Sequence, residues 1–244
     1  YAAILRLSSR IPSHPYLPGP ILSMTIDSPL QAAVFDLDGL MFNTEELYHH
    51  VGGKMLERRG KQLTDDLLSK MMGRQSHEAL QIMIDWHDLD ATAAELEAET
   101  DVIFSEILEL QLKPMPGLQS LLAFLEEQDI PKAIATSSRR GFAVTMLEKY
   151  EMQDRFQFLL TAEDIDLGKP NPQIYLRSAE KLKLDPSQMM VLEDSGNGCR
   201  AAVDSGAYAV AVLANHNRHQ DFPGAQLVAE SLADKRILAA FVRS

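Results

Sequence analysis

Two acidic residues, Asp36 and Asp38, follow a short apolar run in AAVFDLDG, residues 32–39. Residues two apart in an extended strand point the same way, so both carboxyls are expected together at the end of a strand. Carboxyls this close repel each other, which favours their neutral forms unless a cation offsets the charge. Mg²⁺ binds oxygen ligands and commonly accompanies phosphate groups in proteins. The pair is therefore a candidate nucleophile and acid for phosphate chemistry.

Three further segments that should end strands or begin helices carry suitable polar groups. In IATSS the predicted strand finishes with Thr136 and Ser137 at a helix start, where hydroxyls and free backbone N–H groups suit an anion. Lys169 stands in the loop segment GKPNP, and VLEDS supplies Glu193 and Asp194. The carboxyl edge of a parallel α/β sheet is where ligands bind. We therefore expect these side chains to meet there.

Each of these segments also has a purely structural interpretation. A hydroxyl can simply cap a helix, a loop lysine can be solvated, and acids are favoured at helix starts by the dipole. Convergence of all the segments on one sheet edge is what separates the functional interpretation from the structural ones.

The elements that must position these residues alternate along the chain. Strands are predicted at 32–38, 131–136, 156–162, 188–194 and 207–213, with a short apolar run at 227–229. Helices are predicted to begin near residues 118, 139, 172, 198 and 232. Such alternation predicts right-handed crossovers and an α/β fold, a Rossmann-like parallel-sheet core.

Residues 43–112 interrupt this alternation with a block that reads as entirely helical. Helices are expected to start at Thr44, Thr64, Ser76 and Thr92, the first running to Gly60. The last should place one apolar side against the block, formed by Leu96, Ile103, Ile107 and Leu110. The predicted organisation is a core of residues 31–42 and 113–244, a helical cap of 43–112, and an irregular extension of 1–30. The two connections to the cap would make a hinge.

Composition limits the class of partner. The chain has 35 Asp and Glu against 23 Lys and Arg, a net charge of -12, which argues against nucleic acid or anionic membrane as a partner. Cys199 is the only cysteine, which favours a reducing compartment. We expect a soluble, cytoplasmic monomer. Residues 1–30 carry no acid before Asp27; an extension upstream of Met24 is the favoured interpretation, and an organellar targeting role stays open.

The segments FDLDG, ATSS, GKPNP and LEDS, in this order, resemble the four motifs of the haloacid dehalogenase-like superfamily. The resemblance covers about residues 31–240. An inserted helical cap is similar to that of the subgroup with β-phosphoglucomutase and small sugar-phosphate or nucleotide phosphatases. The stretch DGLMFNTEELY is especially similar to pseudouridine-5'-phosphatase-like members.

The resemblance implies a role for each motif residue. Asp36 would attack phosphorus to form an aspartyl-phosphate, and Asp38 would protonate the leaving oxygen and later help to deprotonate water. Thr136 and Ser137 would hold the phosphoryl oxygens, while Lys169 would neutralise charge. Mg²⁺ would be bound by the Asp36 carboxylate, the Asp38 backbone carbonyl and Asp194, with Glu193 close by or joined through water. An Asp at position 38 favours a phosphate ester as substrate over a carbon–halogen bond.

The cap residues favour hydrolysis of a small phosphorylated metabolite over the mutase alternative. Mutases of this kind carry a His in the first cap helix, where this chain has Tyr48 with His49 one residue later, and an Arg where it has Ser76. Arg74 could instead reach the substrate from the cap, and Glu45 should lie where the cap meets the site. A non-catalytic phosphometabolite-binding module would need a damaged site, and none is visible. Four histidines are interpreted as surface or interface residues: His77, His87, His216 and His219.

Overall fold

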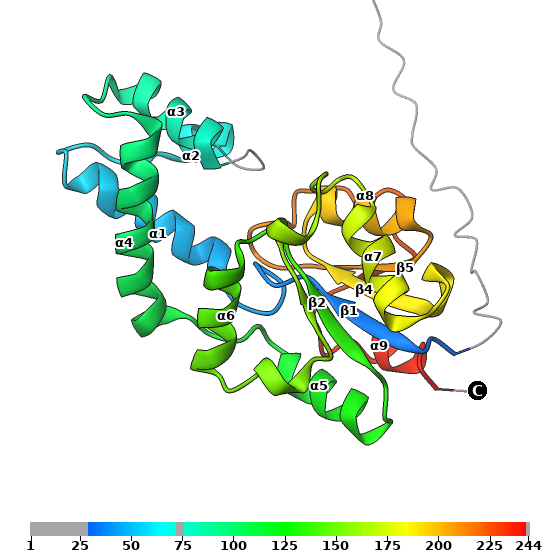
Figure 1. Cartoon of the computed structure of the whole chain (residues 1–244). Helices are drawn as coiled ribbons and strands as arrows, with labels where there is room; N and C mark the ends of the chain where they lie inside the picture. The colour runs from blue at the N-terminus through cyan, green and yellow to red at the C-terminus, as the bar shows by residue number, and fades with distance from the viewer. Residues whose placement is uncertain (1–28, 72–75, 243–244) are drawn as a thin grey trace, which may run out of the picture.

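The structure is a computed structural model that describes residues 29–71 and 76–242. The described residues form a six-stranded, wholly parallel sheet in the order β3-β2-β1-β4-β5-β6 (Figure 1). Its strands are β1 (Ala32–Phe35), β2 (Lys132–Ala135), β3 (Leu159–Leu160), β4 (Met189–Glu193), β5 (Tyr208–Val212) and β6 (Leu227–Ala229). The predicted α/β class is confirmed.

Helices cover both faces of the sheet, which explains why its central strands are apolar on both sides. In β1, Ala32 and Val34 belong to the core on the side of α7 and α8, while Ala33 and Phe35 belong to the core on the side of α5 and α6. Figure 1 shows these two helix pairs on opposite sides of the strands. The core helices are α5 (Leu118–Glu127), α6 (Arg140–Lys149), α7 (Gln173–Leu182), α8 (Gly196–Ser205) and α9 (Lys235–Ala239), with 3₁₀ turns at Gln153–Arg155, Ala162–Asp164 and Pro186–Gln188.

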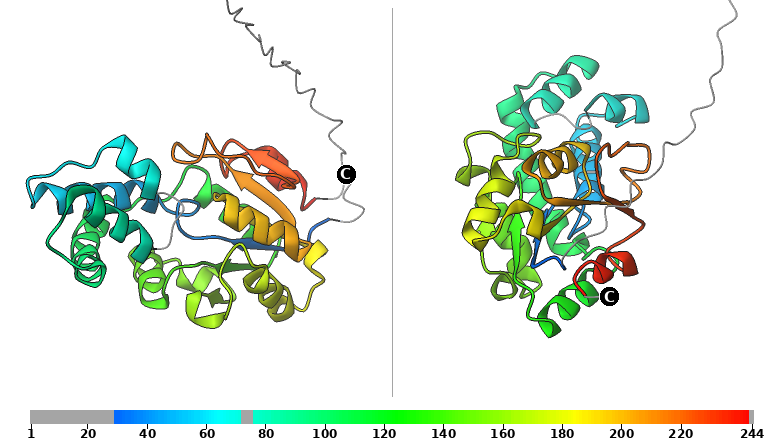
Figure 2. Two further views of the ribbon diagram at one scale, coloured as in Figure 1. Left: turned by 90° about the horizontal axis from the view of Figure 1, so that it is seen from above. Right: turned by 90° about the vertical axis from the view of Figure 1, so that its right-hand side faces the viewer.

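Four helices between β1 and α5 form a separate cap at one end of the sheet (Figures 1 and 2). They are α1 (Thr44–Glu57), α2 (Asp65–Met71), α3 (Ser76–His87) and α4 (Ala93–Gln111). Arg58 and Arg59 of α1 both contact the carboxylate of Glu99 in α4, at 3.1 and 2.6 Å. Buried apolar side chains of the cap helices pack in one continuous cluster with those of the core elements, so the cap is joined to the core by apolar contacts.

The two connections between cap and core are hydrogen-bonded to each other. The backbone N–H of Asn43 donates to the carbonyl of Lys113 at 3.1 Å, and the N–H of Lys113 donates to Asn43 Oδ1 at 2.7 Å. Met115 N–H donates to the Met41 carbonyl at 2.8 Å. The two segments that were predicted to form a hinge therefore lie side by side.

Three local predictions were wrong. Leu110 is 81% exposed, because the buried stripe of α4 is centred between Ile103 and Phe104 and leaves Leu110 at its margin. Thr44 lies inside α1 rather than capping it, and its hydroxyl accepts a bond from Gly39 N–H at 2.9 Å. The strand expected over 156–162 is reduced to β3, which lies at the sheet edge with a single neighbour. No helix in the described ranges is long and apolar enough to cross a bilayer.

Candidate active site

The carboxyl ends of β1 and β4 and the loop before α7 bring Asp36, Lys169 and Glu193 into contact. Lys169 Nζ lies 2.5 Å from Asp36 Oδ1 and 2.7 Å from Glu193 Oε1, and it also donates to the Ala135 carbonyl at 3.0 Å. The Lys169 and Asp36 side chains are only 6% and 9% exposed. Burial alone would lower the pKa of Lys169, but the two carboxylates raise it above its ordinary value. The ammonium therefore remains charged between two acids.

Glu193 is held by donors from three directions. Its Oε1 accepts from Tyr175 Oη at 2.5 Å as well as from Lys169, and its Oε2 accepts from Ser195 Oγ at 3.1 Å and from two backbone N–H groups. A Cβ at Gly198 would lie 1.8 Å from Glu193 Oε1, so only glycine allows α8 to approach this carboxylate. Because both of its oxygens already accept hydrogen bonds, Glu193 is better suited to holding Lys169 in place than to acting as the main ligand of a metal.

Asp36, Glu193 and Asp194 form an oxygen cluster that fits a divalent cation. One carboxylate oxygen from each lies within 4.8 Å of the others, and all three residues are buried. Burial first, and then the neighbouring acids, raise the pKa values of Asp36 and Asp194 well above the ordinary value. One lysine does not balance this group of carboxyls. The spacing and the excess negative charge both suit Mg²⁺, whose ligands stand about 2.1 Å from the ion.

Only one of the two carboxyl oxygens of Asp38 accepts hydrogen bonds from the described residues. Its Oδ2 accepts from Ser138 Oγ at 2.6 Å and from Thr136 Oγ1 at 3.1 Å, whereas Oδ1 is buried with no partner among the described residues. Burial raises the pKa of Asp38, and the hydroxyl contacts, led by that of Ser138, partly oppose the shift. The structure thus keeps one carboxyl oxygen available for a proton or a ligand.

The hydroxyl that joins Thr136 at Asp38 is that of Ser138, two residues later, while the predicted contact of Ser137 with the phosphoryl oxygens stays a prediction. Ser137 is exposed and makes no hydrogen bond that the described residues reveal. The turn that follows β2 directs the side chains of Thr136 and Ser138 to the same acceptor, while the Ser138 N–H also donates to Thr136 Oγ1 at 3.0 Å. The sequence pattern of adjacent hydroxyls could not distinguish these positions.

His216 is the second residue that sequence reasoning missed. Its Nε2 lies 2.6 Å from Asp194 Oδ2, and its side chain is 18% exposed, so the surface interpretation was wrong. It reaches the site from the loop after β5, more than twenty residues beyond the fourth motif. No spacing rule in the sequence points to this contact.

Comparison with known proteins decides the family. The family model for haloacid dehalogenase-like hydrolases matches residues 33–212. The chain belongs to this family. It is 32% identical over 181 residues to the phosphorylated carbohydrates phosphatase of Thermotoga maritima, covering 72% of this chain and 82% of that one. It is also 32% identical over 211 residues to a Drosophila melanogaster protein named "Probable pseudouridine-5'-phosphatase", covering 82% of this chain and 89% of the relative.

Solved structures agree with this assignment. The fold is similar to that of a Thermotoga maritima protein assigned as a β-phosphoglucomutase, with a TM-score of 0.76 and 27% identity. The similarity covers 87% of this chain and 100% of the other. The predicted resemblance to the haloacid dehalogenase-like family is therefore confirmed, and the chain is a hydrolase of that family.

In the hydrolase, Glu45 lies in the first turn of α1, the part of the cap that meets the core. Burial raises the pKa of the Glu45 carboxyl, with His216 opposing the shift and Asp38 adding to it. These charges come from the core, so Glu45 faces the same site as Asp38 and His216. Arg74, the other predicted cap contact, lies outside the described residues.

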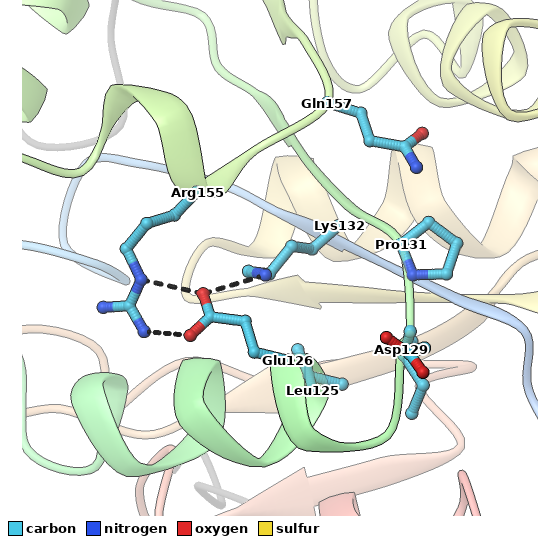
Figure 3. Close-up of a pocket in the computed structure, with 8 residues that line it drawn as sticks. Leu125, Glu126, Asp129, Pro131, Lys132, Arg155 and Gln157 are labelled. Atoms are coloured by element: carbon cyan, nitrogen blue, oxygen red, sulfur yellow. Dashed lines mark hydrogen bonds and ion pairs between the residues drawn. The ribbon is translucent and has the colours of Figure 1, made fainter.

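A shallow cavity at the opposite end of β2 is unrelated to this site (Figure 3). Figure 3 shows Glu126 of α5 between Lys132 and Arg155. Glu126 Oε1 lies 3.0 Å from Lys132 Nζ and 2.8 Å from Arg155 Nε, and Oε2 accepts from Arg155 Nη2 at 2.9 Å. The Lys132 side chain is only 7% exposed. This cluster joins α5 to the start of the sheet, and its two cations already share one carboxylate.

Replacing Glu126 by Gln is expected to destabilise the hydrolase by about 1–2 kcal/mol at pH 7, because the buried Lys132 ammonium loses its carboxylate. Since Glu126 itself is partly exposed, the loss should be smaller than for a fully buried ion pair. Contacts with Arg155 first, then with Lys132, lower the pKa of Glu126 from 4.5 to about 2. This contribution is present above pH 4.5 and is lost as the pH falls toward 2. In urea unfolding, the difference in the free energy of unfolding between the native chain and Glu126→Gln should become smaller as the pH falls from 4.5 toward 2. Glu127→Gln, an exposed neighbour in α5, is the matched control.

Proposed function

We propose that this hydrolase is a Mg²⁺-dependent phosphomonoesterase that acts on a small phosphorylated metabolite through an aspartyl-phosphate at Asp36. The observation that carries the proposal is the 2.5 Å contact of Lys169 Nζ with Asp36 Oδ1, beside an acid cluster suited to a cation. The phosphatase names of the relatives support the reaction class.

In the first step, a carboxylate oxygen of Asp36 attacks phosphorus and the bond to the ester oxygen breaks. Asp38 gives its proton to the departing oxygen, which leaves as an alcohol. The buried Oδ1 of Asp38, which lacks a partner among the described residues, is the atom we assign to this proton. Lys169 balances the charge that builds on the phosphoryl oxygens and on Asp36. Thr136 and Ser138 supply hydroxyl donors at the same edge.

In the second step, Asp38, now ionised, takes a proton from water as the water oxygen attacks phosphorus. The bond between phosphorus and the Asp36 oxygen breaks, which releases inorganic phosphate and restores both carboxyls. The same residue therefore acts as acid and then as base.

The Asp36 carboxylate, the Asp38 backbone carbonyl and Asp194 would hold Mg²⁺, with Glu193 nearby. When bound, the ion supplies positive charge that orients the phosphoryl group and screens it from the carboxylates. In the absence of substrate, the same positive charge would offset the repulsion among the acids, which together with burial raises the pKa values of Asp36 and Asp194.

Hydrolysis of p-nitrophenyl phosphate tests the proposal directly. We expect steady release of p-nitrophenol with Mg²⁺, loss of activity with EDTA, and recovery when Mg²⁺ is restored in excess. A chain that binds phosphate in a Mg²⁺-dependent manner without turnover would instead be a phosphometabolite-binding module, and the proposed activity would be wrong.

The mutase alternative is kept because of the structural similarity to a protein assigned as a β-phosphoglucomutase. Tyr48 stands where a mutase histidine is expected. The centroid of its ring lies 4.6 Å from that of Phe104 and 6.5 Å from that of Phe142. A phenol, with an ordinary pKa near 10, is a poor proton carrier at neutral pH. With β-glucose 1-phosphate and glucose 1,6-bisphosphate, phosphate release should exceed formation of glucose 6-phosphate. The reverse result would favour the mutase.

Glu45 should disfavour substrates whose leaving group carries a negative charge. Two unit charges about 8 Å apart at an effective dielectric of about 40 repel by about 1 kcal/mol, roughly a fivefold effect. We expect the native enzyme to prefer glycerol 3-phosphate over 3-phosphoglycerate, which differs by one carboxylate, and Glu45→Gln to reduce that kcat/KM ratio about fivefold. Glu46→Gln, an exposed neighbour, is the control. An unchanged ratio in the Glu45 variant would remove Glu45 from the substrate site.

A further inference from the structure

The loop after β5 contacts the side chain of Asp194 through His216. The distance from Nε2 to Oδ2 is 2.6 Å, and the Asp194 side chain is 6% exposed. An ionised carboxylate has no hydrogen to donate, so the contact with ionised Asp194 requires the form of His216 that carries a hydrogen on Nε2. The contact fixes one of the two carboxylate oxygens of Asp194, Oδ2, on the side of the loop after β5.

Asn217 holds this loop against the same residue. Its Nδ2 donates to the backbone carbonyl of Asp194 at 2.7 Å and to that of Val212 at 3.0 Å, and its Oδ1 accepts from Ala214 N–H at 2.8 Å. Asn217 is fully buried. The position of His216 is thus set by a neighbour that is itself tied to the end of β4 and to β5.

Gly39 packs against the contact between Asp194 and His216. Its φ is +73°, and a Cβ built there would lie 2.1 Å from Asp194 Oδ2 and 3.1 Å from His216 Nε2. The backbone after Asp38 therefore packs directly on the Asp194–His216 pair, and there is no room for another side chain. The carboxyl of Asp194 is therefore confined between two chain segments, the turn at Gly39 and the loop that carries His216.

We propose that His216 is a positioning residue that orients Asp194 for Mg²⁺ binding. Without this contact the Asp194 carboxylate could rotate, and the oxygen that lies within 4.8 Å of ligand atoms of Asp36 and Glu193 would lose its fixed position. His216 is not itself a metal ligand, because its nitrogens are not part of the cluster whose atoms lie within 4.8 Å of one another. Mg²⁺ also prefers oxygen ligands. The inference rests on the metal site of the proposed function and adds a residue that the four motifs do not contain.

Titration of the full chain with Mg²⁺ alone, followed by calorimetry, tests this role without any measurement of turnover. Loss of a residue that orients a metal ligand typically weakens metal binding about 10–100-fold, and we expect that change for His216→Ala. In His216→Gln the side-chain amide nitrogen can occupy the place of Nε2, so affinity should return to within about threefold of native. His219→Ala, an exposed histidine of the same loop, should bind Mg²⁺ as the native chain does.

Three results would overturn the inference. Native affinity in His216→Ala would show that Asp194 needs no such donor, and equal weakness in the Ala and Gln variants would show that the hydrogen bond is not the cause. In both cases the proposed function would stand. Absence of Mg²⁺ binding by the native chain would overturn the proposed metal and this inference together. Thermal unfolding without Mg²⁺ checks that each variant is folded, and the Mg²⁺-induced rise in Tm should be smallest for His216→Ala.

Discussion

Replacing Asp36 by Asn is expected to lower kcat/KM for every phosphate ester by about 10⁴-fold or more, since loss of a nucleophile removes the covalent route altogether. The amide has nearly the shape of the carboxylate. Lys169 keeps its contact with Glu193 at 2.7 Å, so the buried ammonium is not left without a partner. Burial and the neighbouring acids Glu193, Asp194 and Asp38 raise the pKa of Asp36, and the amide removes both the burial cost of this carboxylate and its repulsion with those acids. The variant should therefore be at least as stable as the native chain.

Thermal unfolding and phosphate-release kinetics measured side by side check this expectation. Asp90→Asn, an exposed acid in the cap, should leave both properties unchanged. Activity within about tenfold of native in a well-folded Asp36→Asn chain would mean that another group attacks phosphorus.

Replacing Asp38 by Asn should lower kcat by about 10²–10⁴-fold, the usual contribution of a positioned acid or base. The variant keeps an oxygen or nitrogen near Ser138 and Thr136, so the local structure should persist. Mg²⁺ and phosphate binding should change little, because the expected metal contact of this residue is its backbone carbonyl. The lower kcat should therefore come from slower proton transfer and not from weaker binding.

The choice of leaving group separates this role from a structural one. Nitrophenolate leaves readily without a proton, whereas the alkoxide of glycerol 3-phosphate does not. The Asp38→Asn loss in kcat/KM should therefore be clearly larger for glycerol 3-phosphate than for p-nitrophenyl phosphate. Equal losses for the two esters would contradict the assignment of Asp38 as general acid.

The parts of the site that lie at strand ends could be predicted from the sequence. Short apolar runs identify buried parallel strands, and such strands end at one edge of the sheet, so the residues that follow them must converge. Asp36, Thr136, Glu193 and Asp194 fall in this class. Lys169 was predictable because its loop precedes a helix that begins at the same edge.

The missed residues depend on features that sequence patterns do not encode. Whether Ser137 or Ser138 reaches Asp38 is decided by the turn after β2, in which single backbone angles redirect a side chain. His216 meets Asp194 only because β4 and β5 are neighbours and Asn217 fixes the loop after β5 against the end of β4. Leu110 was misplaced because helical periodicity gives the width of a buried stripe poorly near the end of a helix.

Rapid acid quench during turnover, followed by mass measurement of the peptides, tests the central claim most directly. The account predicts that the peptide containing Asp36 gains the mass of one phosphoryl group within the first turnover, that the modification decays as phosphate is released, and that Asp36→Asn never shows it. A phosphoryl group found on a different residue, or inversion of configuration at phosphorus during catalysed hydrolysis, would contradict the account.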